Sequence, residues 1–239
     1  MPQLMVNFVE LRMYSWGMLL VLVSYVYLFD AILINTKKSW ILFTIFSTLA
    51  VYVHFYSCLS MVFMYAFLLC YAIIKNKSLI KKIILSGLFV SVCYLPWLVV
   101  IIKHLAKDGS GFWISPITFS NVIEYVKYVV FPTSDSQILN IFLGFAWIVS
   151  ILFIIFKYLK DSWKNNDKFL YIIGILVLIF IVGTGILVSI LINPLFVSRY
   201  MFFGIGIFWL SIALMFGKLL EKNSSLFIIC LLYTSDAAD

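Results

Sequence analysis

The chain has 239 residues, of which 64% are hydrophobic and 11% are charged, and its mean hydropathy is +1.12. Soluble domains carry about a quarter charged residues, so this composition excludes an ordinary soluble protein. The formal net charge of +7 requires no nucleic-acid partner, because lysines in the cytoplasmic loops of a membrane protein account for it. The apolar residues form long runs rather than short alternating segments, which predicts an all-α, polytopic transmembrane helical bundle and no β-barrel.

The first half of the chain contains three apolar runs. The first, Met13–Ile34, is long enough for one crossing of the membrane, whereas the second, Trp40–Ile74, is too long for one. Two short helices with a turn near His54–Ser57 fit the second run, because lysines flank both of its ends and two crossings return the chain to the same side. The third run, Ile83–Ile102, contains Pro96, which membrane helices tolerate.

The segment Lys103–Asn140 is the one long polar excursion. Within it, Ser120–Phe131 places valines and isoleucine near one helical face, with Glu124 and Lys127 off that face. This pattern predicts a short helix that either lies in the membrane interface or packs on the bundle as an ordinary loop helix.

Three further crossings are expected at Ile141–Phe156, Phe169–Ile192 and Met201–Leu220, so the chain has about seven crossings and a short interfacial helix. We assign residues 1–230 to one transmembrane domain that is incomplete at both ends. A final apolar run stops at about Leu232, too short to span. Residues 231–239 resemble translated read-through, so we treat them as a non-native tail.

The distribution of lysines predicts the orientation of the helices. If the loops around residues 37–38, 75–82, 157–168 and 218–222 are cytoplasmic, twelve of the 17 Lys and Arg residues lie inside. The opposite, extracytoplasmic face then carries Glu10, Arg12, His54, the polar excursion and Arg199.

Arg12 and Arg199 lie at the ends of spans on the face where positive charge is scarce. One interpretation is snorkelling, in which each side chain reaches the interface and avoids the cost of burial. The other is phosphate binding, because the forked donors of a guanidinium match phosphate oxygens.

Five short motifs together resemble the bacterial membrane glycosyltransferases of family 39, relatives of the protein O-mannosyltransferases and of the aminoarabinose transferase of lipid A. Glu10, Arg12 and Tyr14 follow Pro2 in an E-x-R-x-Y pattern before an apolar span. The other four motifs, in chain order, are Tyr52-Val-His54-Phe-Tyr56, Leu95-Pro96-Trp97, Phe112-Trp113-Ile114 with Pro116, and Ser198-Arg199-Tyr200-Met201.

The resemblance implies a GT-C fold with an extracytoplasmic active site that transfers a sugar from a polyprenyl-phosphate donor to an acceptor. Such a reaction needs a base for the acceptor and cations for the departing phosphate. Arg12 and Arg199 would bind the phosphate, and Tyr14 and Tyr200 would donate hydrogen bonds. Glu10 would orient Arg12 or contact the sugar. His54 would hydrogen-bond substrate, although a lone histidine at a helix turn is more often structural.

The catalytic acid of this family lies upstream of the E-x-R-x-Y segment, so the catalytic residue is expected upstream of Met1 and is unknown here. We therefore predict no transferase activity for the chain as it stands. The acids expected on the outer face do not match the family's base; they are Glu10, Asp108, Glu124 and Asp135.

Two other functions are weighed against the enzyme. A transporter or lipid flippase subunit would place polar residues at the midplane, often within an internal repeat, and we find no repeat. A non-catalytic membrane scaffold is the third alternative.

Gly183-Thr184-Gly185 is interpreted as a helix-packing site. The four cysteines lack metal-ligand spacing, and we expect no metal, no cofactor and no nucleic-acid partner. The sequence does not determine the oligomeric state.

Overall fold

The structure, a computed structural model, describes residues 13–107, 116–130, 136–160, 165–191, 194 and 196–222. Within these ranges it is a bundle of helices without strands, which confirms the predicted all-α fold. The helices are α2 (Tyr14–Leu33), α3 (Lys37–Val53), α4 (Phe55–Lys75), α5 (Ile80–Lys107), α6 (Phe119–Val130), α7 (Gln137–Lys160), α8 (Asn165–Leu191) and α9 (Phe202–Lys222), with short 3-10 turns η1 (Lys77–Leu79) and η2 (Ser198–Met201).

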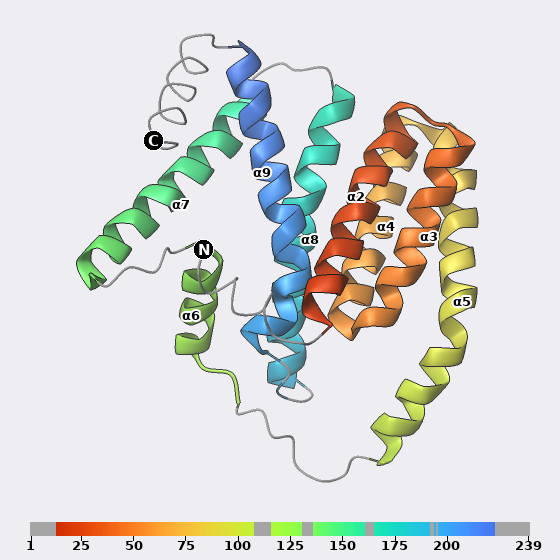
Figure 1. The fold of residues 1–239 in the computed structure, drawn as a ribbon, viewed down its shortest axis with the longest axis horizontal. Helices are drawn as coiled ribbons and strands as arrows, with labels where there is room; N and C mark the ends of the chain where they lie inside the picture. The colour runs from red at the N-terminus through yellow and green to blue at the C-terminus, as the bar shows by residue number, and fades with distance from the viewer. Residues whose placement is uncertain are drawn as a thin grey trace.

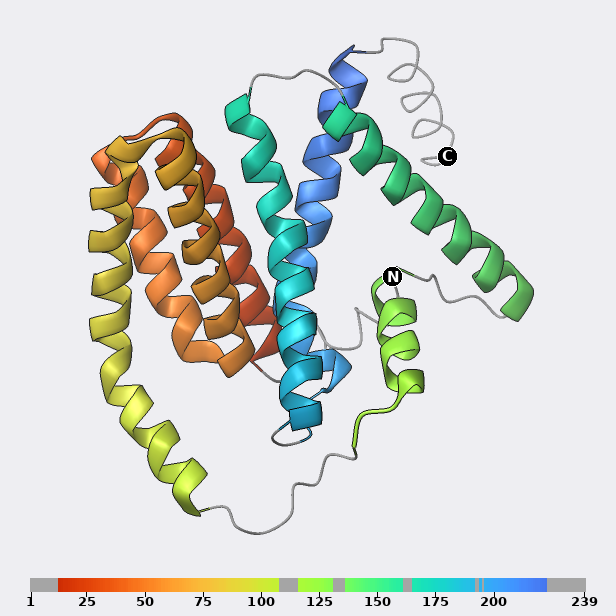
Figure 2. The same cartoon turned by 180° about the vertical axis from the view of Figure 1, so that it is seen from behind.

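Successive long helices run in alternating directions (Figure 1). Helices α2, α3 and α4 lie side by side, with α5 on their outer flank, and α8 and α9 pack together against α2 and α4. Seen from behind, α6 and α7 lie on the opposite flank from α5 (Figure 2). Because each long helix reverses the direction of the one before it, every second helix junction comes to the same end of the bundle.

Six of these helices, all but α3 and α6, are long and apolar enough to cross a membrane. Helix α3 has 17 residues, which lies at the lower limit for a span of about 17–25 residues. It runs beside α2 and α4 from one end of the bundle to the other (Figure 1). The seven long helices match the expected apolar segments in number, and six of them meet the length and hydropathy of a membrane span.

The predicted break in the long apolar run lies at His54. Its backbone is extended, with φ −162° and ψ 151°, and its Nδ1 accepts a hydrogen bond from the Tyr56 N–H at 3.2 Å. His54 is thus the residue that caps the N-terminus of α4. The Ser57 hydroxyl donates to the Ala50 carbonyl at 2.7 Å, which holds the ends of α3 and α4 together.

The lysines of the described residues gather mainly at the end of the bundle opposite His54, which we call the lysine end. At this end α2 passes to α3 through Asn35, whose φ of 57° is left-handed, a conformation that Asn tolerates at a helix C-terminus. Lys82 Nζ donates to Asn35 Oδ1 at 2.6 Å. The lysine end contains Lys37, Lys38, Lys75, Lys77, Lys81, Lys82, Lys157, Lys160, Lys168 and Lys218.

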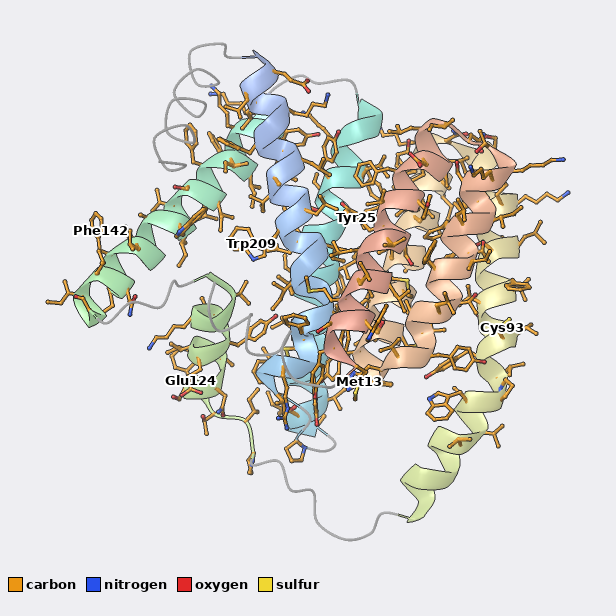
Figure 3. The ribbon with its side chains drawn as sticks, viewed as in Figure 1. Met13, Tyr25, Cys93, Glu124, Phe142 and Trp209 are labelled. Carbon is orange, nitrogen blue, oxygen red and sulfur yellow. The ribbon has the colours of Figure 1, made fainter. Side chains whose placement is uncertain are left out.

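Helices α8 and α9 approach each other closely in the core, where Gly174 meets the backbone of Ile207. A Cβ atom at Gly174 would lie 2.4 Å from the Ile207 carbonyl oxygen and 2.1 Å from Ser211 Oγ. Tyr25 on α2 joins this pair, because its hydroxyl donates to the Leu170 carbonyl at 2.6 Å and lies 2.9 Å from Ser211 Oγ. Figure 3 shows Tyr25 between α2 and the α8–α9 pair.

The expected packing site at Gly183–Gly185 is only half present. A Cβ at Gly185 would meet Met201 Cε at 2.6 Å and the Tyr56 hydroxyl at 3.2 Å, whereas one at Gly183 would meet nothing within 4 Å. The prediction was right for Gly185 and wrong for Gly183, because residues two apart on a helix face different directions.

Helix α6 begins one residue before the predicted Ser120. Thr118 and Asn121 exchange hydrogen bonds at its start, with the Thr118 N–H donating to Asn121 Oδ1 at 2.8 Å. Tyr125 is buried, with its ring 5.9 Å from that of Phe196 near η2, while Ile123 remains exposed. The helix therefore packs on the bundle through one face and leaves apolar side chains on another.

Large apolar side chains cover the outer surfaces of α5 and α7. Phe142 on α7 is 68% exposed and Phe89 on α5 is 56% exposed. On the other side of α7, Trp147 meets Trp209 of α9 with ring centroids 6.0 Å apart. Apolar surface of this extent requires an apolar surrounding, which the hydrocarbon core of a membrane supplies.

Candidate functional site

The end of the bundle opposite the lysine end contains a cluster of rings centred on His54. Tyr14 is the first residue of α2, His54 lies between α3 and α4, and Tyr200 lies in η2 immediately before α9. These three residues are separated by long helices in the sequence. They meet because the alternating helices return the chain to the same end each time.

The ring distances define what we call the aromatic cluster: Tyr14, His54, Tyr56, Tyr200 and Phe203. The His54 ring lies 5.0 Å from that of Phe203, 5.2 Å from Tyr200 and 6.1 Å from Tyr14, measured between centroids. Tyr56 completes the cluster at 6.0 Å from both His54 and Tyr200. His54 therefore contacts every other ring of the cluster.

Burial divides the cluster into a supporting layer and a more accessible layer. Tyr14 is 2% exposed, Tyr56 3% and Phe203 0%, so these rings pack in the core. His54 and Tyr200 are only partly buried. The accessible layer presents an imidazole and a phenol, both able to hydrogen-bond a ligand.

Arg199 lies beside this layer. Its Cζ is 5.7 Å from the centre of the Tyr200 ring, within the range of a cation–π interaction. The side chain is partly exposed although its Nε atom is buried. The cluster therefore has a permanent positive charge next to the phenol of Tyr200, whose ring lies 5.2 Å from that of His54.

Burial lowers the pKa of His54 from its usual 6.5 to about 4, so the imidazole is neutral near pH 7. Because Nδ1 accepts the Tyr56 N–H, the remaining proton is assigned to Nε2. His54 thus offers an N–H donor at Nε2. A group with so low a pKa is a weak base, which favours a hydrogen-bonding role over proton abstraction.

We expect acidification to destabilise the protein through His54. The pKa is lower in the folded chain than in the unfolded chain, so the unfolded chain gains the proton first as the pH falls from about 6.5 to about 4. Folding stability should therefore drop across that window, by about 1–2 kcal/mol at pH 5. Thermal unfolding in detergent at pH 7.5 and pH 5 measures the difference.

His54→Asn is the matched variant for this experiment, because Asn also caps a helix N-terminus but does not titrate. The drop in melting temperature between the two pH values should shrink in this variant. An unchanged drop would assign the acid sensitivity to other groups.

Of the six residues predicted for the site, the structure brings four together: Tyr14, His54, Arg199 and Tyr200. Glu10 and Arg12 lie outside the described residues, as does the Phe112-Trp113-Ile114 motif. Tyr52 points elsewhere, since its hydroxyl donates to the Cys93 carbonyl of α5. Trp97, also on α5, is exposed.

Two members of the cluster, Tyr56 and Phe203, were not predicted as site residues. Tyr56 ends the Tyr52–Tyr56 motif, and Phe203 lies four residues after Arg199, a spacing that brings helical residues to one face. Gly17 makes room for the Phe203 ring, because a Cβ there would lie 2.3 Å from it. No sequence signal marks Gly17.

The described residues contain no group of three or more His, Cys, Asp or Glu side chains able to hold a metal. Glu124 is exposed on α6 (Figure 3), and Asp30 lies near the lysine end of α2. Within the described part of the chain, the aromatic cluster thus has no carboxylate of its own. Its chemistry is that of a cation with hydrogen-bond donors, which suits an anion.

The helices define the chain as a multi-pass α-helical membrane protein. Comparison with protein-family models, with curated proteins and with solved structures finds no match.

Proposed function

We propose that this chain is the transmembrane part of a glycosyltransferase that takes its sugar from a polyprenyl phosphate and transfers it to an extracytoplasmic acceptor. One observation carries the proposal: Tyr14, His54, Arg199 and Tyr200, from three separate motifs, lie at one end of the bundle. Each motif resembles a segment of the family 39 glycosyltransferases.

The proposed role of Arg199 is to bind the phosphate of the lipid carrier. A guanidinium donates paired hydrogen bonds to phosphate oxygens and keeps its charge at every relevant pH. The neutral His54 and the Tyr200 hydroxyl would donate further hydrogen bonds to the phosphate or the sugar. All three groups are partly exposed, which supports access for a ligand.

An apolar cavity of about 420 Å³ offers a place for part of the polyprenyl chain. It lies between α3, α4 and α5, and Cys58, Tyr94 and Leu98 are among its lining residues. Cys58 is one helical turn from His54. A carrier with its phosphate at the aromatic cluster would thus have an apolar site nearby on the other face of α4.

The positive-inside rule supports the proposed side of the membrane. Most lysines of the described residues lie at the end away from the aromatic cluster, and cytoplasmic loops carry the excess of Lys and Arg. This supports a cytoplasmic lysine end in the cell membrane and an extracytoplasmic site.

Binding of the lipid carrier tests the proposal directly. We expect undecaprenyl phosphate to raise the melting temperature of the purified chain in detergent, and undecaprenol, which lacks the phosphate, to raise it much less. A tenfold preference corresponds to about 1.4 kcal/mol. Equal effects of the two lipids would contradict a phosphate site. Movement of a labelled lipid across vesicles that contain the chain would instead support the flippase alternative.

A further inference from the structure

A second apolar groove lies at the lysine end, between α3 and α5, with a volume of about 580 Å³. It is separate from the aromatic cluster and from the cavity beside Cys58. Its lining residues are Lys37, Trp40, Ile41, Thr44, Ile45, Lys82, Leu85, Ser86 and Phe89.

The groove is polar at one end and apolar along the rest of its length. Lys37 is in the first turn of α3 and Lys82 is in the first turn of α5, so both lie where the helices begin. The apolar residues follow one to two turns deeper along the two helices. Ile41 is 57% exposed, Leu85 57% and Phe89 56%, so the walls are open toward the surrounding lipid.

Hydrogen bonds hold the polar end of the groove in place. Asn35 Oδ1 accepts from Lys82 Nζ at 2.6 Å and from Trp40 Nε1 at 3.0 Å. Lys82 retains two further N–H donors after this bond, because an ammonium has three. The α3 N-terminus beside Lys37 adds the partial positive charge of its helix dipole.

Deeper in the groove, hydrogen bonds on its inner side connect α5 to α3 and α4. Ser86 of α5 lies 2.7 Å from Thr44 Oγ1 and 2.6 Å from the Tyr65 hydroxyl. The hydroxyl groups of Thr44 and Ser86, which form the floor of the groove, thus already have hydrogen-bond partners within the protein. The floor therefore needs no polar ligand, and an apolar chain fits against it.

We propose that this groove binds an anionic phospholipid of the leaflet at the lysine end, with its phosphate between Lys37 and Lys82 and one acyl chain along Ile41, Ile45, Leu85 and Phe89. Charge complementarity selects this occupant. The lining residues include two lysines and no Asp or Glu, so an anionic headgroup is favoured over a zwitterionic one, whose cation would have no partner there. The proposal depends only on the membrane bundle and not on the proposed transferase function.

Two double variants with equal net charge test the site. Lys37→Gln with Lys82→Gln removes the two lysines of the groove. Lys38→Gln with Lys81→Gln removes their immediate neighbours in the sequence, which are exposed at the same end but do not line the groove. Native mass spectrometry of the full chain, titrated with phosphatidylglycerol or phosphatidylcholine, measures the affinity for each lipid.

We expect the wild-type chain to prefer phosphatidylglycerol, and the Lys37/Lys82 variant to bind it roughly 10- to 30-fold more weakly, since each lysine near the membrane surface contributes about 1 kcal/mol. The Lys38/Lys81 variant should lose less than about 3-fold. Equal losses in the two variants would show attraction by general surface charge and would overturn the site. Equal binding of the two lipids by the wild-type chain would overturn it as well.

Ile45→Trp provides a second test that keeps both lysines. A larger side chain there fills the apolar part of the groove, so the number of phosphatidylglycerol molecules retained by the chain should fall by one. Unchanged retention would overturn the placement of the acyl chain.

Discussion

Arg199→Ala is expected to weaken the binding of undecaprenyl phosphate by about 30-fold, or ~2 kcal/mol, because it leaves the phosphate without a partly desolvated cation. The same thermal-shift titration used for the wild-type chain measures this change. Arg199→Lys should recover only part of the affinity, since an ammonium keeps the charge but lacks the paired donors.

The control for this variant is Lys127→Ala, which removes an exposed cation of α6 on the proposed extracytoplasmic side. It should leave binding within about 2-fold, because an exposed, solvated charge contributes little. If Arg199→Ala lowers protein level and melting temperature but leaves the affinity unchanged, Arg199 anchors the end of α9 and is not a phosphate ligand.

Gly174→Ala is expected to destabilise the bundle by about 1–3 kcal/mol, the usual cost of inserting a group into a packed core. The added Cβ would lie 2.4 Å from the Ile207 carbonyl oxygen. A backbone atom cannot rotate away as a side chain can, so α8 and α9 must separate. Thermal unfolding of the purified chain should show a clearly lower melting temperature.

Gly183→Ala on the same helix is the matched control, because a Cβ at Gly183 meets nothing within 4 Å. Alanine also has the higher helix propensity, so this variant should be neutral or slightly more stable. Equal destabilisation by the two variants would show that the loss comes from the glycine backbone and not from the contact between α8 and α9.

The apolar runs predicted the helices well but not their ends. Helix α5 was expected at Ile83–Ile102 and extends over Ile80–Lys107, because lysine is a good helix former and continues the helix beyond the apolar segment at both ends. The break at His54 was also predicted, from the length of the apolar run. The sequence motifs predicted four residues of the site, namely Tyr14, His54, Arg199 and Tyr200. They did not predict that Phe203 contacts the rings of Tyr14 and His54.

The sequence by itself determined the class of protein, the number and order of the long helices and the separation of the lysines from the motif residues. Long apolar runs and charge positions are local properties, and a bilayer converts them into spans and loops. Only the tertiary structure decided which side chains meet. Three features depend on the rotation and approach of helices distant in the sequence. They are the contact of Gly174 with Ile207, the burial of His54 and the position of Lys37 and Lys82 in one groove. Hydropathy carries no information about that rotation, because in lipid both faces of a helix can be apolar and close packing sets the contacts.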